Sequence, residues 1–183
     1  SGLCIMLTVS LSLMVSAGAE EAVKDDPAGP AVKQTAAEIH DSVFNLCSDG
    51  KQDEAEELLT AGLRSFPDSV ELLFFKSMLR RSRWDKAVSH MVFQKIIMEK
   101  PESVEARASK FTLLLDEGAD IERNFAGLAE LVDKNPKNLV LLWLAAIECR
   151  ELEKNQEGAE YYKRLGKHFK TGPSLFHQSY ANI

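Results

Sequence analysis

Four histidines are the side chains best suited to acid–base or metal chemistry in this sequence, but their spacing supports neither role. His40, His90, His168 and His177 fall in separate stretches of the chain, without the short separations that bring metal ligands together. The sequence also contains no GxSxG, HExxH or CxxC motif and no glycine-rich phosphate loop. We therefore predict a protein that is not an enzyme and that has no metal site and no cofactor.

The cysteines and the carboxylates do not form a reactive group either. Cys4 stands at the start of an apolar run, whereas Cys47 and Cys149 lie among apolar residues, where a buried cysteine behaves as a small hydrophobic side chain. Cys47 and Cys149 also fall in the first and last complete units of the repeat described below, so we expect no disulfide between them. The acidic stretch DEAEE at 53–57 is explained by the first turn of a helix, where carboxylates interact favourably with the helix dipole.

The composition is typical of a folded protein, and the net charge argues against nucleic-acid binding. Apolar residues make up 45% of the sequence and charged residues 27%, which is typical of a packed domain. The formal net charge of −6 argues against binding to a phosphate backbone, which selects a basic face. The basic patch KSMLRRSR at 76–83 has two interpretations: a receptor for an acidic peptide, or a solvated helix end.

The N-terminal stretch resembles a secretory signal peptide. Residues 1–19 carry no charge, and the apolar run at 3–15 is followed by Ala17-Gly18-Ala19, an A-x-A pattern. The run is short for a membrane span, which needs about 20 apolar residues, although an uncleaved signal anchor remains the alternative. We expect cleavage after Ala19, a periplasmic or secreted protein, and no membrane insertion of the mature chain. The missing basic n-region predicts that the sequence begins inside the true N-terminus.

Residues 20–35 form a flexible acidic linker by composition, and the folded part is expected to begin near Ala36. The linker, EEAVKDDPAGPAVKQT, contains two prolines and shows no apolar periodicity. From Ala36 onward apolar residues recur at helical spacing, without the alternation of period two that a strand needs. Gly50, between two such stretches, suits the left-handed conformation that ends a helix. Pairs of short antiparallel helices are therefore predicted.

Four prolines divide the helical part into units of nearly equal length. Pro67, Pro101, Pro136 and Pro173 each follow a helical, partly apolar stretch, at spacings of 34, 35 and 37 residues. A proline cannot continue a helix and disfavours helical geometry in the preceding residue, so each one separates two helix pairs. A period near 34 residues with two helices per unit is typical of the tetratricopeptide (TPR) solenoid.

The first unit resembles the TPR consensus residue by residue. This family places bulky and small residues at fixed positions, so that two helices pack closely before a closing proline. Ser42 and Val43 depart from the consensus. The matching residues are Ile39, Leu46 and Leu59 (bulky), Ala55 and Gly62 (small), Gly50 (turn) and Pro67.

The second unit resembles the family through SRWDKA at 82–87, which is similar to the start of a second TPR helix. Ala87 lies fourteen residues before Pro101, whereas Ala55 lies twelve before Pro67. We therefore expect the first helix of the second unit to be shortened and its second helix lengthened.

The later units match less completely. The third unit has Gly118 at the turn but no small residue that corresponds to Ala55. In the fourth unit we expect Trp143 at a bulky position, Asn155 at the turn, and Ala159 and Gly166 at the small positions. Sel1-like, HAT and PPR repeats have related patterns and remain alternatives.

The resemblance implies an all-α fold, a right-handed superhelical solenoid of antiparallel helix pairs. We expect about four repeats plus a partial fifth, and no capping element after the last one, so that the chain is a fragment of a longer protein. The expected parts are the signal peptide 1–19, the linker 20–35 and the repeat domain 36–183, with repeats at 36–69, 70–103, 104–138, 139–172 and 173–183.

The resemblance also implies a concave groove, lined by the first helix of each repeat, that binds a peptide. The carboxylate clamp of some TPR proteins is not expected, because its Lys and Asn positions hold other residue types here. The groove positions carried over from the family are His40, Phe44, Phe74, Met78, Arg81, Ala108, Thr112, Leu144 and Glu148. An apolar stripe such as the one that includes Phe74 and Met78 more often packs against a neighbouring helix.

The predicted function is a scaffold that binds a protein or peptide outside the cytoplasm. One alternative is a helical accessory module of a larger enzyme, or of a secretion or export component, whose active part lies beyond residue 183. Another alternative is a solenoid that self-associates through its uncapped end. The sequence does not identify the partner.

Overall fold

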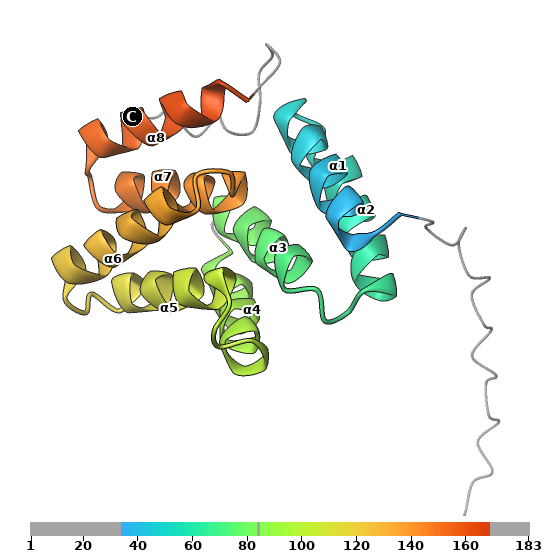
Figure 1. The fold of residues 1–183 in the computed structure, drawn as a ribbon, viewed down its shortest axis with the longest axis horizontal. Helices are drawn as coiled ribbons and strands as arrows, with labels where there is room; N and C mark the ends of the chain where they lie inside the picture. Colours follow the sequence, from blue (N-terminus) through green and yellow to red (C-terminus); the bar gives the residue numbers. More distant parts are fainter. Residues whose placement is uncertain (1–33, 84, 169–183) are drawn as a thin grey trace, which may run out of the picture. The chain divides into compact units, whose positions relative to one another are not determined.

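Eight α-helices make up the part of the chain that the computed structural model describes, residues 34–83 and 85–168 (Figure 1). This range contains no strand, so the predicted all-α class is confirmed. The predicted signal peptide, most of the linker and the partial unit at 173–183 lie outside the described residues. The helices are α1 (Ala36–Ser48), α2 (Gln52–Ser65), α3 (Val70–Ser82), α4 (Lys86–Glu99), α5 (Val104–Asp116), α6 (Ile121–Lys134), α7 (Leu139–Glu151) and α8 (Asn155–Gly166).

The first helix of every pair begins with the same polar cap. The side-chain oxygen of the capping residue accepts a hydrogen bond from the backbone N–H three residues later, a donor that the helix itself leaves unpaired. In α1 the cap is reciprocal, because Glu38 also accepts from the backbone N–H of Thr35 at 2.8 Å. The capping residues are Thr35, Ser69, Ser103 and Asn138.

The turns within the pairs also repeat one geometry. In the first pair, the backbone N–H of Lys51 donates to the carbonyl of Leu46, five residues earlier, and equivalent bonds close the other three turns. Gly50 and Gly118 have φ values of 76° and 70°, which only glycine adopts without strain. In the fourth pair the left-handed residue is Glu153, with φ of 57°. The prediction of Asn155 at this turn is therefore wrong, because Asn155 is the first residue of α8.

The prolines separate the helix pairs as predicted. α2, α4 and α6 each end two residues before Pro67, Pro101 or Pro136. Two residues after each proline, the backbone N–H of the next capping residue donates to a carbonyl three residues earlier, at 3.0 to 3.1 Å. This hydrogen bond turns the chain into the following helix.

Helices that follow one another in sequence pack against one another throughout the described part, which is consistent with an α-solenoid. The first helices of neighbouring pairs also touch: α1 with α3, α3 with α5, and α5 with α7. In addition α3 contacts α7, two pairs further on. As a result every residue of α7 from Val140 to Cys149 is buried, so this helix forms the centre of the core.

Close helix contacts depend on small residues, but not on all those expected. A Cβ on Gly62 would lie 2.8 Å from Cγ2 of Ile39, which agrees with the predicted close approach. In the fourth pair Gly158 packs against Cys149, whereas Gly166 faces open space and Ala159 is half-buried. The expectation for Ala159 and Gly166 is therefore wrong.

The second pair has regular helix lengths, and the prediction that its first helix is shortened and its second lengthened is wrong. α3 and α4 have 13 and 14 residues, the same as α1 and α2. The small buried residue of α4 is Ser89, which is fully buried, whereas Ala87 is exposed. No helix within the described ranges combines the length and the apolar character that crossing a membrane requires.

Candidate functional site

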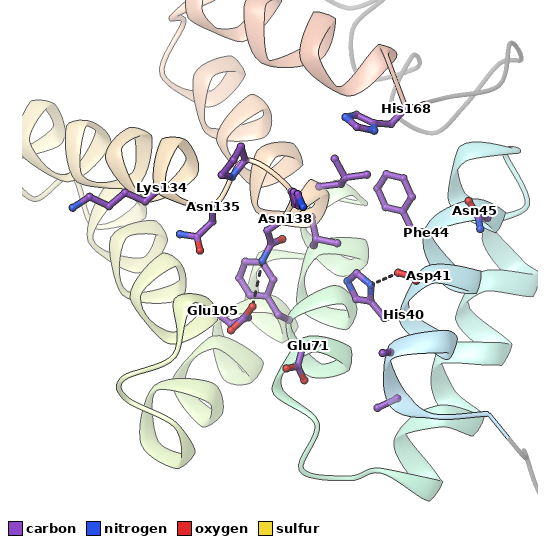
Figure 2. A pocket seen from close by; sticks show the side chains of 17 residues that line it. His40, Asp41, Phe44, Asn45, Glu71, Glu105, Lys134, Asn135, Asn138 and His168 are labelled. Atoms are coloured by element: carbon purple, nitrogen blue, oxygen red, sulfur yellow. Dashed lines mark hydrogen bonds and ion pairs between the residues drawn. The ribbon is translucent and has the colours of Figure 1, made fainter.

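A cleft of about 1090 Å³ opens between α1 and the turn that joins α6 to α7 (Figure 2). Its walls come from α1 on one side and from the N-terminal ends of α3, α5 and α7 on the other. The turn at 134–138 and His168, just after α8, complete the rim. The capped helix starts and the proline turns described above therefore place the residues of this cleft.

The floor of the cleft is apolar and firmly packed. Phe44 is 7% exposed, Phe74 2% and Val140 1%, so each side chain shows only an edge to the cleft. The ring of Phe44 meets that of Phe75 edge to face at 6.5 Å, and the His40 ring meets Phe75 in the same way at 5.3 Å. These contacts fix the α1 wall against α3.

The rim of the cleft carries charges of both signs. Asp41, Glu71 and Glu105 come from α1, α3 and α5, whereas Lys134 is the last residue of α6 and Lys137 lies in the turn that follows. Nδ1 of His40 lies 3.3 Å from Oδ1 of Asp41. The amide of Asn138 donates to Oε1 of Glu105 at 3.3 Å while its oxygen caps α7. The rim therefore presents carboxylates from α1, α3 and α5 together with ammonium groups from the end of α6 and the turn after it.

Three of the sequence-predicted groove residues line this cleft: His40, Phe44 and Phe74. The other predicted groove residues are buried in the core and do not line this cleft. The physical reason is that α7 packs against both α3 and α5 and covers the faces that a groove would expose. The buried residues are Met78, Arg81, Ala108, Thr112, Leu144 and Glu148, each at most 1% exposed.

Two of those buried residues belong to a charge cluster that the sequence did not predict. Nη1 of Arg81 donates to Oδ2 of Asp116 at 2.7 Å, and Nη2 donates to Oδ1 at 3.1 Å. Nη2 of Arg81 also lies 2.7 Å from Oε1 of Glu148, but without the alignment of a hydrogen bond. The Arg81 and Glu148 side chains are both 1% exposed, and that of Asp116 is 9% exposed. A single guanidinium is thus shared by two carboxylates.

Further charges surround Asp116 on the side nearer to solvent. Nζ of Lys86 donates to Oδ1 of Asp116 at 3.3 Å and to Oε2 of Glu151 at 2.9 Å. Nε2 of His90 donates to Oδ2 of Asp116 at 2.7 Å. Asp116 and Glu151 are the last residues of α5 and α7, where the helix dipole disfavours a carboxylate. The cations from α3 and α4 compensate that unfavourable placement.

The pKa values of the two inner carboxylates of the cluster are shifted in opposite directions. Burial opposes ionisation of Asp116, but the hydrogen bonds and charge of Arg81, together with the hydrogen bond from His90 and the charge of Lys86, outweigh it and lower the pKa of Asp116 to about 2. Burial raises the pKa of Glu148 to about 7, because Arg81 offsets only part of the desolvation and Asp116 adds repulsion. Asp116 is therefore the ionised partner of Arg81, whereas ionisation of Glu148 is unfavourable in the folded chain.

This arrangement joins α3, α5 and α7 through buried charges. Arg81 and Glu148 are both 1% exposed, so the inner part of the cluster is closed to solvent. No group of three or more potential metal ligands occurs among the described residues. One sequence signal does exist: Arg81, Asp116 and Glu151 are each 35 residues apart, so the repeat places them at equivalent helix ends.

The cysteines of the described region are buried and unreactive. Cys47 and Cys149 are both free and 0% exposed, as expected for small apolar side chains. Burial raises the pKa of each thiol to about 12, so neither forms a thiolate near neutral pH.

No model of a known protein family matches the sequence, and no curated protein matches it either. The TPR resemblance, the export signal and the binding role are thus predictions that depend on the residues of this chain alone.

Proposed function

We propose that this chain is a TPR-like helical repeat scaffold that binds a peptide segment of another protein in the cleft between α1 and the α6–α7 turn. The single observation that carries the proposal is the cleft itself. Its volume of about 1090 Å³ lies at the upper limit of small-molecule pockets, which typically measure about 300–1,000 Å³. The cleft also combines an apolar floor with a charged rim, which suits an amphipathic chain segment.

Binding in this cleft would use the packed floor for affinity and the rim for orientation. An apolar side chain of the partner would cover the edges of Phe44, Phe74 and Val140, which are among the apolar side chains that line the cleft. Donor groups of the partner would face Asp41 and Glu71. Because ring contacts already fix the floor, little conformational entropy is lost on binding, which favours affinity.

The finer features of the fold and the location belong to the same proposal. The right-handed superhelix of the TPR family is supported by the period, the proline turns and the consecutive packing of the helix pairs. Action outside the cytoplasm, in the periplasm or as a secreted protein, is supported by the signal-like residues 1–19. We assign no catalytic step to the chain.

The proposal is tested by selecting peptides from a displayed library on the purified chain and measuring their affinity by fluorescence anisotropy. We expect Asp41→Lys and Lys137→Glu, both at exposed rim positions, to weaken the selected peptides at least about tenfold, since each reverses a charge that the peptide faces. Glu117→Lys is the matched control, because it makes the same kind of charge reversal at an exposed residue directly after the C-terminal end of α5. The cleft and Glu105 lie at the N-terminal end of that helix.

Peptides that bind all three variants as tightly as the native chain would place the binding site elsewhere. A library that yields no specific peptide would remove the support for a peptide-binding role.

A further inference from the structure

The N-terminal ends of α3 and α5 place two carboxylates at equivalent positions of the repeat. Glu71 and Glu105 are each the second residue of their helix, 34 residues apart in sequence, and both line the cleft. α3 and α5 contact each other, and Figure 2 shows both side chains at the helix ends that border the cleft. We refer to Glu71 and Glu105 together as the acidic wall.

Each carboxylate of the acidic wall is oriented by a neighbouring polar group. Oγ of Ser69 donates to Oε2 of Glu71 at 3.0 Å, and Nδ2 of Asn138 donates to Oε1 of Glu105 at 3.3 Å. A carboxylate has about four acceptor positions, so each one keeps acceptor capacity beyond these bonds. Within the described residues neither forms an ion pair with a lysine or arginine, whereas Asp116 in the buried cluster does. The acidic wall is therefore oriented, and no side chain of the described residues neutralises its charge.

The other charges around the cleft do not compensate the acidic wall. The N-terminus of a helix carries about half a positive charge, so the ends of α3 and α5 offset only about half of the charge of the two carboxylates. Asp41 adds a third carboxylate from α1. Lys134 is paired with Glu130, which leaves Lys137 as the unpaired ammonium group among the described residues that line the cleft. This balance of charge favours a cationic group in the occupant.

The apolar floor begins one helical turn from the acidic wall. Phe74 follows Glu71 by three residues on α3, which places the two on one face of the helix with Cβ atoms about 5–6 Å apart. In an extended peptide, residues i and i+2 point to the same side and lie about 7 Å apart. In a helical peptide, residues three or four apart share a face. A basic and an apolar side chain at any of these separations can therefore reach the acidic wall and the floor together.

We propose that the segment bound in the cleft carries an arginine or lysine that forms ion pairs with Glu71 and Glu105, beside an apolar side chain that covers the edge of Phe74. This inference rests on the proposed function and names the chemistry of its partner. A guanidinium presents five donors in a planar fork, so it bridges two carboxylates from neighbouring helices better than an ammonium group does. Arginine is therefore the preferred residue.

The first test selects peptides from a displayed random library on the native chain and on the Glu71→Gln/Glu105→Gln variant. Glutamine keeps an oxygen that accepts from Ser69 and Asn138, so the variant loses the charge and retains these hydrogen bonds. On the native chain we expect arginine and lysine, two to four residues from an apolar residue, to be enriched at least about threefold over the unselected library. The variant should select peptides without this enrichment.

The matched control is Glu117→Gln/Glu157→Gln. Both residues are exposed and neither lines the cleft, so this variant changes the net charge of the chain equally and leaves the acidic wall intact. It should select basic peptides as the native chain does. A loss of the enrichment in the control as well would show that net charge alone is responsible, and would overturn the inference.

The second test is a double-mutant cycle measured by fluorescence anisotropy with the tightest native-selected peptide, labelled with fluorescein. Replacing its basic residue by glutamine should weaken binding to the native chain about tenfold, and binding to Glu71→Gln/Glu105→Gln less than about twofold, because the facing carboxylates are gone. If circular dichroism shows that the double variant does not fold, Glu71→Gln alone, at an exposed position, replaces it; the same change in the peptide should then weaken binding about threefold.

Two results of these tests would overturn the inference directly. One is the absence of basic enrichment on the native chain, or the same enrichment on the native chain and the Glu71→Gln/Glu105→Gln variant. The other is an equal loss of affinity on both chains when the basic residue of the peptide is replaced.

The inference and the proposed function fail in different ways. If the selected peptides are weakened by Asp41→Lys or Lys137→Glu but show no basic enrichment, the chemistry of the partner is wrong and peptide binding in the cleft is retained. If the native chain selects no peptide, both proposals fail.

Discussion

Replacing Glu148 by Gln tests the account of the buried charge cluster most directly. Glu148 shares the guanidinium of Arg81 with Asp116, and its side chain is only 1% exposed. Gln has nearly the same shape as Glu, so the substitution removes the negative charge without leaving a cavity. The remaining pair of Arg81 and Asp116 keeps both of its hydrogen bonds, at 2.7 and 3.1 Å.

The expected effect depends on pH, and its sign follows from the raised pKa of Glu148. This carboxyl titrates near 4.5 in the unfolded chain and at about 7 in the folded chain. Between these values the folded chain binds more protons than the unfolded chain, so the contribution of Glu148 to stability falls as pH rises from about 4.5 to 7. Above pH 7 the ionised carboxylate destabilises the fold by on the order of 1–3 kcal/mol.

The assay is urea unfolding followed by circular dichroism at 222 nm, at pH 5 and pH 8. At pH 5 we expect Glu148→Gln and the native chain to have nearly equal free energies of unfolding. At pH 8 the variant should be more stable by about 1–3 kcal/mol, with an unchanged urea m-value. Ionisable groups far from the cluster occur in both chains and therefore contribute equally to the two free energies of unfolding. Glu117→Gln, at an exposed position, is the control and should change stability at neither pH.

The opposite result would refute this account. If Glu148→Gln is less stable than the native chain at pH 8 by more than about 1 kcal/mol, Glu148 is a favourable ionised partner of Arg81, because breaking a net favourable buried pair is destabilising. Asp116 would then not be the main partner of Arg81 in solution.

Three further substitutions test the cluster and the packing. Arg81→Met should lower the free energy of unfolding by about 3–5 kcal/mol in urea at pH 7, because it leaves buried carboxylates without their shared cation. Asp116→Asn should lower the free energy of unfolding by about 2 kcal/mol at pH 7 and by little near pH 2. The reason is that the pKa of Asp116, lowered to about 2, contributes stability above pH ~4 that disappears on acidification. Measuring the stability of both chains as a function of acidic pH checks this. Gly62→Ala should destabilise by about 1–3 kcal/mol in thermal unfolding, because its Cβ would lie 2.8 Å from Ile39, whereas Gly166→Ala, which faces open space, should change stability by less than about 0.5 kcal/mol.

The helix boundaries were predictable because local chemistry determines them. A proline ends a helix wherever it stands, and Gly50 and Gly118 supply the left-handed turns that follow α1 and α5. Trp143 shows where local counting fails. Trp143 is the fifth residue of α7 and therefore the equivalent of His40 in α1, and not of Ile39 as predicted. Separately, the turn between α5 and α6, residues 117–120, is one residue longer than the corresponding turns, and Asp120 there has φ of 36°.

The candidate site was less predictable because packing between distant repeats creates it. Family positions identified His40, Phe44 and Phe74, which belong to the first two helix pairs, where the register is simple. The burial of Arg81 and Glu148 requires the contact of α3 with α7, which no pattern within a single repeat encodes. The part of the cleft made by the turn at 134–138 is likewise formed only when the fourth pair lies opposite α1.

The cleft and the charge cluster lie at opposite ends of the same helices. Glu71, Glu105 and Val140, at the N-terminal ends of α3, α5 and α7, line the cleft, whereas Arg81, Asp116 and Glu148 lie toward their C-terminal ends. Each of these helices has 13 residues, so the two sites are about 15–20 Å apart along rigid elements. Apolar contacts alone would not fix the orientation of α3, α5 and α7, because such contacts are non-directional. The guanidinium of Arg81, which donates two hydrogen bonds to Asp116, restricts how these helices can rotate and slide against one another. The buried charge cluster, in which ionisation of Glu148 is unfavourable, therefore helps to hold the helix ends that form the cleft at a fixed separation.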